Sequence, residues 1–188
     1  MRPEVTDEML MQGYRAGDAP SFAALFARHN GGLFRYFLRQ CRDHGTAEQL
    51  AQDVWLRVIK AAASYEVTAK FTTYLYRIAH NQLIDHVRHL TTRAEDALDD
   101  ASEEVEALAA PELNLPDRQH ERRQLAQRLV SALEALPADQ CEAFLLHEEA
   151  GMTLDEIAAV TGAGRETIKS RLRYALHKLR SSLAGVNE

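Results

Sequence analysis

Apolar residues recur every three or four positions along most of the chain, and no stretch shows the strict alternation of a half-buried strand. In residues 47–58 (AEQLAQDVWLRV), for example, Leu50, Val54 and Val58 fall on one helical face. Ala, Leu, Glu, Arg and Gln dominate the composition, and all of them favour helices. The sequence therefore predicts an all-α fold.

The boundaries of the expected helices follow from caps and breakers. Thr46 is a good N-cap with Gln49 three residues later, Gly31-Gly32 is expected to loosen the second helix, and residues 64–72 are expected to form a loop. Helical spacing predicts one apolar stripe, formed by Leu125, Leu129, Leu133 and Leu136. The expected helices cover roughly residues 7–16, 22–41, 47–58, 73–89, 117–136, 138–150, 154–161 and 164–183.

Residues 91–117 differ in composition from the rest of the chain. They contain nine acidic residues and one base, Arg93, together with Pro111 and Pro116, and they have no aromatic residue. Such a segment buries too little apolar surface to offset the entropy of ordering. The sequence therefore predicts two small helical domains joined by a flexible acidic linker. The domain boundaries fall at residues 1–90, 91–117 and 118–188.

Two further features of the sequence indicate the cellular compartment in which the protein works. No window approaches the roughly 18 apolar residues of a membrane span, and the N-terminal residues lack the pattern of a secretory signal. Cys41 and Cys141 are far apart, lie on apolar helix faces and form no CxxC pair. We therefore expect a cytoplasmic protein with reduced cysteines and no direct membrane insertion.

Residues 153–172 (TLDEIAAVTGAGRETIKSRL) have the pattern of a helix-turn-helix. Thr153 and Glu156 have capping-box spacing, and Gly162 suits the left-handed turn between two helices. The formal net charge is −6, yet residues 163–180 carry six bases and one acid. The exposed face of the second helix combines long bases with short hydroxyls, which can donate to guanine or phosphate and reach base edges: Arg165, Thr167, Lys169, Ser170, Arg171 and Arg173. The pattern favours DNA reading over the alternative, a solvated basic face.

Three segments resemble one known family. Residues 136–180 (LPADQCEAFLLHEEAGMTLDEIAAVTGAGRETIKSRLRYALHKLR) are similar to region 4 of bacterial sigma-70 family sigma factors of the extracytoplasmic-function group. Residues 47–58 resemble region 2.2 of that group, and residues 71–89 (FTTYLYRIAHNQLIDHVRH) resemble its regions 2.3 and 2.4. The resemblance covers nearly all of both expected domains, in the family's order.

The resemblance implies a transcription initiation factor, not an enzyme, with no cofactor. Such a factor binds core RNA polymerase, with region 2 on the clamp of the largest subunit and region 4 on the flap of the second-largest subunit. It directs promoter-specific initiation, because region 2 melts the −10 element and region 4 reads the −35 element. The resemblance also implies an anti-sigma factor as a regulatory partner.

Site residues follow where the motifs match. The polymerase-facing set is Glu48, Gln49, Gln52 and Asp53, in which Gln49 stands where the family usually has an acid. The −10 set is Lys70, Phe71, Tyr74, Arg77, Asn81 and Arg88, in which Tyr74 replaces the usual tryptophan and keeps a surface for stacking a base. Arg77 and Arg88 are expected to track phosphates. In the −35 helix, Tyr174 stands where the family has arginine.

Several alternatives stay open at the level of sequence. The chain could be a dimeric DNA-binding regulator, or a helical interaction module without a DNA role, although the latter leaves the basic helix unexplained.

The roles of three smaller features also stay open. The acidic linker could thread a polymerase channel or only add solubility. One of Tyr74 and Tyr76 is expected in the core. A second mode of regulation is phosphorylation of Thr46, which would restore the charge that Gln49 lacks.

Two other groups of residues are interpreted as solvated surface. His80, His86 and His89 share one helix, but no acid or cysteine completes a metal-ligand spacing, so no metal site is expected. Glu148 and Glu149 have no partner that would suggest chemistry and are interpreted as a solvated face.

Overall fold

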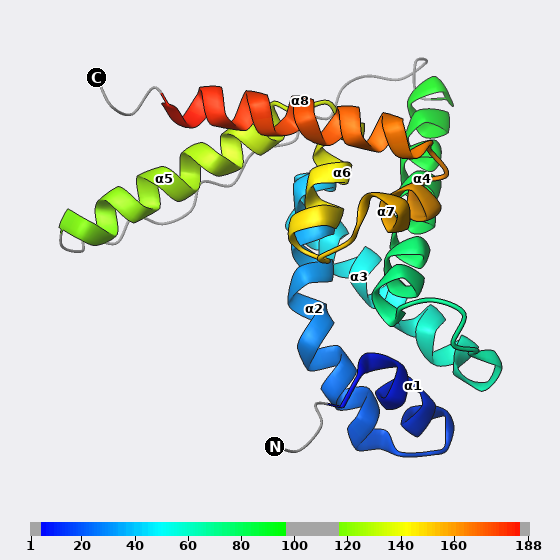
Figure 1. Cartoon of the computed structure of the whole chain (residues 1–188). Coiled ribbons are helices and arrows are strands. Elements are labelled where there is room, and N and C mark those ends of the chain that lie inside the picture. Colours follow the sequence, from blue (N-terminus) through cyan, green and yellow to red (C-terminus); the bar gives the residue numbers. More distant parts are fainter. Residues whose placement is uncertain (1–4, 97–116, 185–188) are drawn as a thin grey trace.

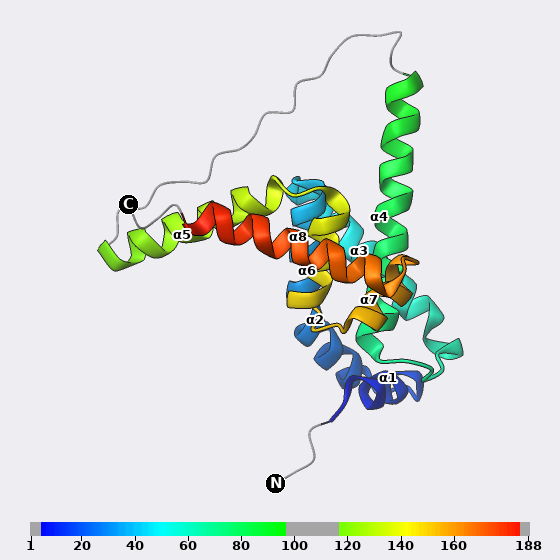
Figure 2. The ribbon, with the colours of Figure 1, turned by 45° about the horizontal axis from the view of Figure 1, so that its top comes forward.

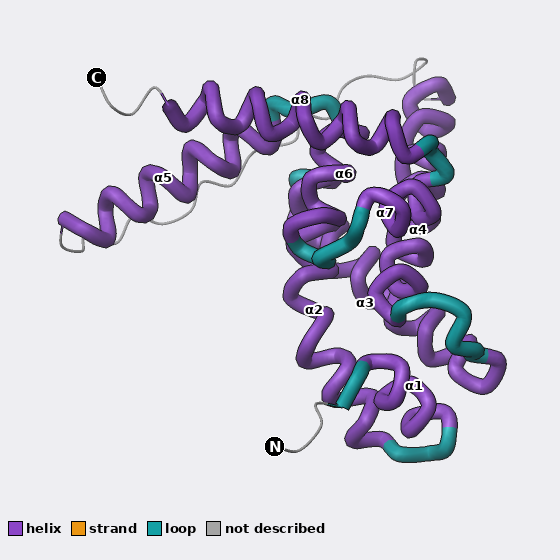
Figure 3. The backbone as a smooth tube through the Cα atoms, in the orientation of Figure 1, coloured by secondary structure: helices purple, strands orange, loops and turns teal. Residues whose placement is uncertain are grey.

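The computed structural model describes residues 5–96 and 117–184, with side chains over 5–93 and 124–183. All regular structure in these ranges is helical, as Figure 3 shows. The all-α prediction is therefore confirmed. Most of the predicted linker, residues 97–116, lies outside the described residues.

Four α-helices and one short 3-10 turn form the N-terminal unit. Aromatic and aliphatic side chains from all of them fill its interior, including Tyr36, Phe37, Trp55 and Leu75. Helix α2 packs against both α1 and α3, and α4 packs against α3 (Figure 1). The elements are α1 (Asp7–Arg15), α2 (Ala19–Cys41), α3 (His44–Ala61), η1 (Ala62–Ser64) and α4 (Phe71–Asp96).

Four further helices form the C-terminal unit: α5 (Asp117–Glu134), α6 (Ala138–Glu148), α7 (Leu154–Thr161) and α8 (Arg165–Ala184). Helix α8 is their common partner, because it packs against α5, α6 and α7. Figures 1 and 2 show α5 and the end of α8 projecting away from the other helices.

The two units pack against one another. Helix α6 lies on α2, and α7 lies on α4 (Figure 1). The buried residues of both units form one cluster. The arrangement within the described residues is therefore more compact than two domains held only by a tether.

Three sequence predictions about the helices are wrong, two about where a helix begins or ends and one about a helix interior. Helix α3 begins before Thr46, because the Asp43 carboxylate caps it by accepting the Thr46 N–H at 2.7 Å. Helix α2 runs unbroken through Gly31-Gly32. Helix α4 continues to Asp96, seven residues beyond the expected end, so its last turns occupy the start of the predicted linker.

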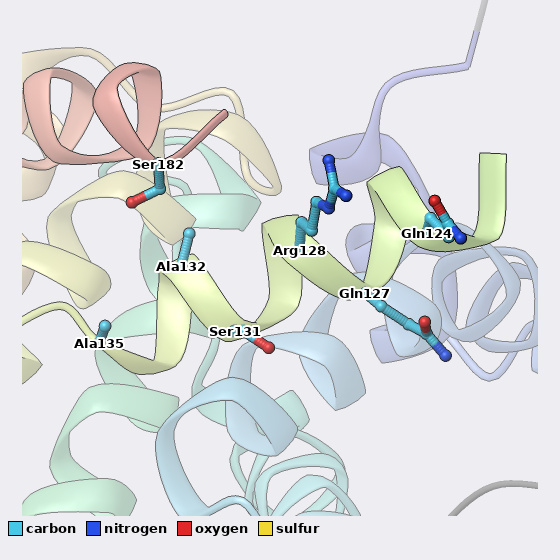
Figure 4. Close-up of a pocket in the computed structure, with 7 residues that line it drawn as sticks. All are labelled: Gln124, Gln127, Arg128, Ser131, Ala132, Ala135 and Ser182. Atoms are coloured by element: carbon cyan, nitrogen blue, oxygen red, sulfur yellow. The ribbon is translucent and has the colours of Figure 1, made fainter. Parts of the chain in front are cut away.

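The predicted apolar stripe on α5 is only partly buried. Leu133 and Leu136 are in the core, whereas Leu125 and Leu129 are 51% and 37% exposed. Spacing places all four leucines on one face, but α5 projects away from the other helices, so part of this face has nothing to pack against. An open pocket lies between the second half of α5 and α8, lined by polar and small residues that include Ser131, Ala132 and Ser182 (Figure 4).

The cysteines lie where the sequence predicted them. Cys141 is buried, Cys41 is half-buried, and neither forms a disulfide. Burial raises the pKa of both thiols to about 11. Both side chains are therefore protonated at neutral pH and act as small packing groups.

The capping box of α7 is present as predicted. The Thr153 hydroxyl accepts the Glu156 N–H at 3.3 Å, and the Glu156 carboxylate accepts the Thr153 N–H at 2.8 Å. The Thr153 N–H, and then Lys70, lower the pKa of Glu156. A carboxylate with a lowered folded pKa contributes stability above its unfolded pKa, and this is lost as pH falls through the folded value.

We expect Thr153→Ala to lower the free energy of unfolding by about 1 kcal/mol at neutral pH, because one orphan N–H of α7 loses its acceptor. Urea unfolding followed by circular dichroism measures this difference. Thr167→Ala is the matched control, because Thr167 is exposed on α8. An equal loss in both variants would show that the cap contributes nothing specific.

Candidate nucleic-acid interface

Helices α7 and α8 form the predicted helix-turn-helix. Gly162 ends α7 with φ +69, a left-handed backbone in which glycine carries no steric penalty. Helix α8 then begins at Arg165, and Ile157, Ile168 and Leu172 are buried between the helices. The geometry leaves the polar face of α8 on the outside.

Most of the predicted reading residues lie on that outer face. Arg165, Thr167, Lys169 and Arg173 are exposed, while Ser170 is half-buried. Arg165 Nε lies 3.1 Å from Asp155 Oδ1, and Lys169 Nζ lies 3.4 Å from Glu166 Oε2. Exposed ion pairs of this kind contribute little to stability, so both bases can exchange a carboxylate for a phosphate.

Arg171 differs from its neighbours on α8. Its side chain is 27% exposed, and its Nε lies 2.9 Å from Asp139 Oδ2 at the start of α6. This pair ties α8 to α6. The structure therefore gives Arg171 a packing role that the sequence pattern did not indicate.

Tyr174 follows the reading face and is 52% exposed. The Arg173 guanidinium lies 5.1 Å from the centre of its ring. A cation over a ring face is held by the ring quadrupole, so this contact restrains Arg173 at the surface.

A second polar face lies on the first half of α4. Tyr74, Arg77 and Asn81 follow helical spacing, so they share one face of the helix. Arg77, Asn81 and Arg88 are exposed, and Tyr74 is half-buried. The structure therefore brings together most of the residues that the sequence assigned to the −10 set.

Phe71 does not belong to this exposed face. Its side chain is fully buried, with its ring 5.5 Å from His29 and 6.2 Å from Tyr74 between centroids. The Glu8 carboxylate accepts its backbone N–H at 2.8 Å. In this conformation Phe71 is a core residue that anchors the start of α4 and cannot stack on a base.

The expectation that one of Tyr74 and Tyr76 lies in the core is confirmed. Tyr76 is buried, whereas Tyr74 is only half-buried.

A small cavity of about 40 Å³ lies beside Tyr74. Thr73 Oγ1 and Tyr65 OH both belong to residues lining it, and both atoms are buried without a hydrogen-bond partner within the described residues. Sequence reasoning missed these two residues: Tyr65 lies outside the segments that resemble the family, and Thr73 lies within residues 71–89 but was not assigned to the −10 set. Buried polar atoms are nearly always paired, so two orphans beside one cavity mark a place suited to a polar ligand. The cavity holds about one water-sized volume, so a larger group requires the 65–70 loop to move.

The predicted polymerase-facing residues divide between two surfaces. Glu48 and Gln52 lie on an apolar groove of about 590 Å³ between α2 and α3, together with Trp55. Gln49 and Asp53 line a separate polar pocket of about 240 Å³ between α3 and α4. The groove also carries three exposed apolar side chains, Phe26, Leu56 and Ile59. Of these two surfaces, the α2–α3 groove is the more typical protein-binding site, because its centre is apolar and its rim is polar.

In each of the two groups interpreted as solvated surface, one residue makes a partly buried contact, whereas His89 and Glu148 are exposed as predicted. His80 Nδ1 lies 2.7 Å from Glu142 Oε1, with the His80 side chain only 13% exposed. Glu149 accepts from Arg35 of α2. Both were misassigned because their partners are distant in sequence. In the described part of the chain, no group of three or more His, Cys, Asp or Glu side chains could hold a metal ion.

None of the described helices is long and apolar enough to cross a membrane.

Both helical units match models of known families. Residues 25–93 match the family described as Sigma-70 region 2, and residues 132–181 match Sigma-70, region 4. The RNA polymerase sigma factor CarQ of Myxococcus xanthus is 33% identical, with 92% of this chain and 95% of CarQ covered. The ECF RNA polymerase sigma factor SigK of Mycolicibacterium vanbaalenii is 31% identical, with 96% of this chain and 92% of SigK covered.

Two solved structures have the same fold. One is the sigma factor RpoE of Bartonella quintana in complex with the anti-sigma factor NepR, with a TM-score of 0.69, 25% identity, and 90% of this chain and 100% of that chain covered. The other is CnrH in complex with the cytosolic domain of CnrY, with a TM-score of 0.65, 22% identity, and 96% and 99% covered.

Proposed function

Because the chain belongs to the sigma-70 family of RNA polymerase sigma factors, in its extracytoplasmic-function group, we propose which of its surfaces perform each step of promoter recognition. As a sigma factor it directs transcription initiation at promoters by RNA polymerase. The observation that carries the assignment is that one chain presents an exposed basic helix on a helix-turn-helix and, separately, an aromatic and basic face on α4.

Helix α8 reads the −35 element in the major groove. Arg165 and Lys169 are exposed on its first turns, where a recognition helix approaches base edges, and Thr167 lies between them. Arg173, restrained by Tyr174, contacts a phosphate. Ser170 and Arg171 complete the set. Arg171 first has to leave Asp139, so its contribution is smaller than its position alone suggests.

The α4 face melts the −10 element. An extruded base stacks on Tyr74, while Asn81 offers an amide to a base edge, and Lys70, Arg77 and Arg88 hold phosphates. The hydroxyls of Tyr65 and Thr73, which lack a hydrogen-bond partner among the described residues, supply the polar contacts of the base pocket once the 65–70 loop has opened. In this role Phe71 supports the pocket from the core.

The α2–α3 groove docks on core polymerase. We assign it to the clamp of the largest subunit, with Glu48 and Gln52 at its rim and Phe26, Leu56 and Ile59 as its apolar contacts. Gln49 and Asp53, in the adjoining polar pocket, contribute at the edge of this surface. The flap of the second-largest subunit binds region 4.

The cellular compartment, the lack of enzymatic activity and the regulatory partner follow from this function. The protein works in the cytoplasm, has no enzymatic activity, and is held inactive by an anti-sigma factor. The sigma factor RpoE of Bartonella quintana, which has the same fold, occurs in a complex with the anti-sigma factor NepR, and this supports such a partner.

Run-off transcription tests the proposal. Purified protein, sigma-free core polymerase and a genomic promoter library are combined, and the start sites are mapped. Starts that share a −10 and −35 pair are expected. Asn81→Ala and Lys169→Ala are each expected to lower their yield by about 5- to 150-fold, because a lost base or phosphate contact is worth roughly 1–3 kcal/mol.

Ala159→Ser is the control, because Ala159 is exposed on α7 and belongs to none of the proposed surfaces. A protein that makes no specific starts, but binds duplex DNA tightly as a dimer without polymerase, would replace this proposal with a dimeric regulator.

A further inference from the structure

Helix α1 lies before residue 25, where the match to Sigma-70 region 2 begins, and the surfaces proposed for DNA and polymerase do not include it. Its side chains Leu10 and Met11 are buried in the core. At the start of α1, the Asp7 carboxylate accepts from Arg28 Nη1 at 2.7 Å and lies 2.6 Å from His29 Nε2, and both partners belong to α2. Helix α1 is therefore fixed on α2 by packing and by hydrogen bonds.

One side chain of α1 caps the helix that carries the melting face. The Glu8 carboxylate accepts the Phe71 N–H at 2.8 Å, and Phe71 is the first residue of α4. The first N–H groups of a helix have no partner inside it, and a preceding Ser, Thr, Asp or Asn usually supplies one. Here the preceding residue is Lys70, whose side chain has no acceptor. The hydrogen bond from the Phe71 N–H lowers the pKa of Glu8, so the cap is an ionised carboxylate at neutral pH.

A second side chain of α1 holds the other end of the 65–70 loop. Arg15 Nη1 donates to the Tyr65 carbonyl oxygen at 3.0 Å. Tyr65 directly follows the 3-10 turn, and its side chain is buried. Residues 66–70, by contrast, are all exposed. Arg15 and Glu8 of one helix therefore fix the two ends of a loop whose middle faces solvent.

The fixed loop forms one wall of the small cavity beside Tyr74. The loop residues that line this cavity after Tyr65 are Glu66, Thr68 and Ala69. The cavity holds about one water-sized volume, so a base enters only when the middle of the loop moves outward. Because both ends of the loop stay fixed, the wall closes on the base without the ordering of a free chain, which would cost conformational entropy at that step.

We propose that Glu8 and Arg15 are positioning residues for promoter melting, because they hold the 65–70 loop where it receives the extruded −10 base. This inference rests on the proposed function of the α4 face. Neither residue contacts DNA: Glu8 acts through the first N–H of α4, and Arg15 acts through the loop backbone. Loss of either anchor therefore reduces capture of the base, while the binding of polymerase and of −35 DNA stays unchanged.

The fraction of promoter-bound holoenzyme that forms open complexes tests the proposal. Permanganate reaction of unpaired thymines measures it, at a promoter found by run-off transcription. Glu8→Ala and Arg15→Ala are each expected to lower this fraction about tenfold, since one hydrogen bond to a charged group is lost. Glu8→Gln is expected to stay within about twofold of the parent, because its amide oxygen still accepts the Phe71 N–H. Met9→Ala is the control on the same helix, because Met9 is 56% exposed.

Polymerase affinity separates positioning from folding. Titration of each labelled protein with sigma-free core polymerase is expected to give the same Kd for the parent and the variants. A parallel loss of polymerase affinity and of open complexes would show that the anchors only maintain the fold, and would overturn the proposal. Open complexes at the parent level in both Glu8→Ala and Arg15→Ala would overturn the proposal and leave the proposed function standing. A parent protein that opens no promoter would overturn both.

Abasic promoters test whether the anchors act through the base pocket. The base is removed from one −10 nucleotide at a time, and open complexes are compared between the parent and Glu8→Ala. At the position of the captured base, the two proteins are expected to open the promoter equally, because no base remains to occupy the pocket and the two changes are coupled. A difference between the two proteins that persists at every position would place the effect of Glu8 outside the pocket and overturn the proposal.

Discussion

Phe71→Ala is expected to lower the free energy of unfolding by about 3–5 kcal/mol, the range for a large aromatic side chain removed from a packed core. The ring is fully buried against His29, Tyr65 and Tyr74. Its loss leaves a cavity at the point where α4 begins. Urea unfolding of the full chain, followed by circular dichroism, measures the difference.

Two variants separate the core role from a role in holding DNA. Phe71→Leu retains apolar volume and is expected to cost less than Phe71→Ala, by about 1 kcal/mol or more. Tyr74→Ala removes a half-buried ring and is expected to reduce transcription strongly with a smaller loss of stability. If Phe71→Ala instead loses less than about 1 kcal/mol while promoter melting is abolished, the ring serves DNA and the core assignment is wrong.

Local features of this fold could be predicted because their determinants lie within a few residues. The Thr153–Glu156 box and the turn at Gly162 depend on contacts over three or four positions, and both are present. Thr46 shows the limit of such reasoning. Asp43 is an equally good cap, and the helix begins at the earlier of the two.

Contacts between the two units could not be predicted in this way. Tyr36 and Glu142 are 106 positions apart, and Arg35 and Glu149 are 114 apart. A polar residue on a helix looks the same in sequence whether it faces water or another helix. Glu149 and His80 were therefore interpreted as solvated. The resemblance that placed Phe71 among the DNA contacts likewise contained no information on which ring faces inward.

Leu56→Asp is expected to weaken binding to core RNA polymerase roughly 30-fold or more, the effect of losing a central apolar contact of about 2 kcal/mol at an interface. Leu56 is 50% exposed on the α2–α3 groove, beside Phe26 and Ile59. Because it is exposed, the change is expected to alter the free energy of unfolding by no more than about 0.5 kcal/mol. Titration of labelled protein with sigma-free core polymerase, without DNA, isolates this step from promoter binding.

Leu90→Asp is the matched control, since Leu90 is 52% exposed on α4, outside the groove. Both variants add the same charge at a similar exposure, so a difference between them reports location alone. If both bind polymerase as tightly as the parent, the groove is not the docking surface. If both bind weakly, added charge and not the groove accounts for the loss. Only selective weakening by Leu56→Asp places polymerase on the groove.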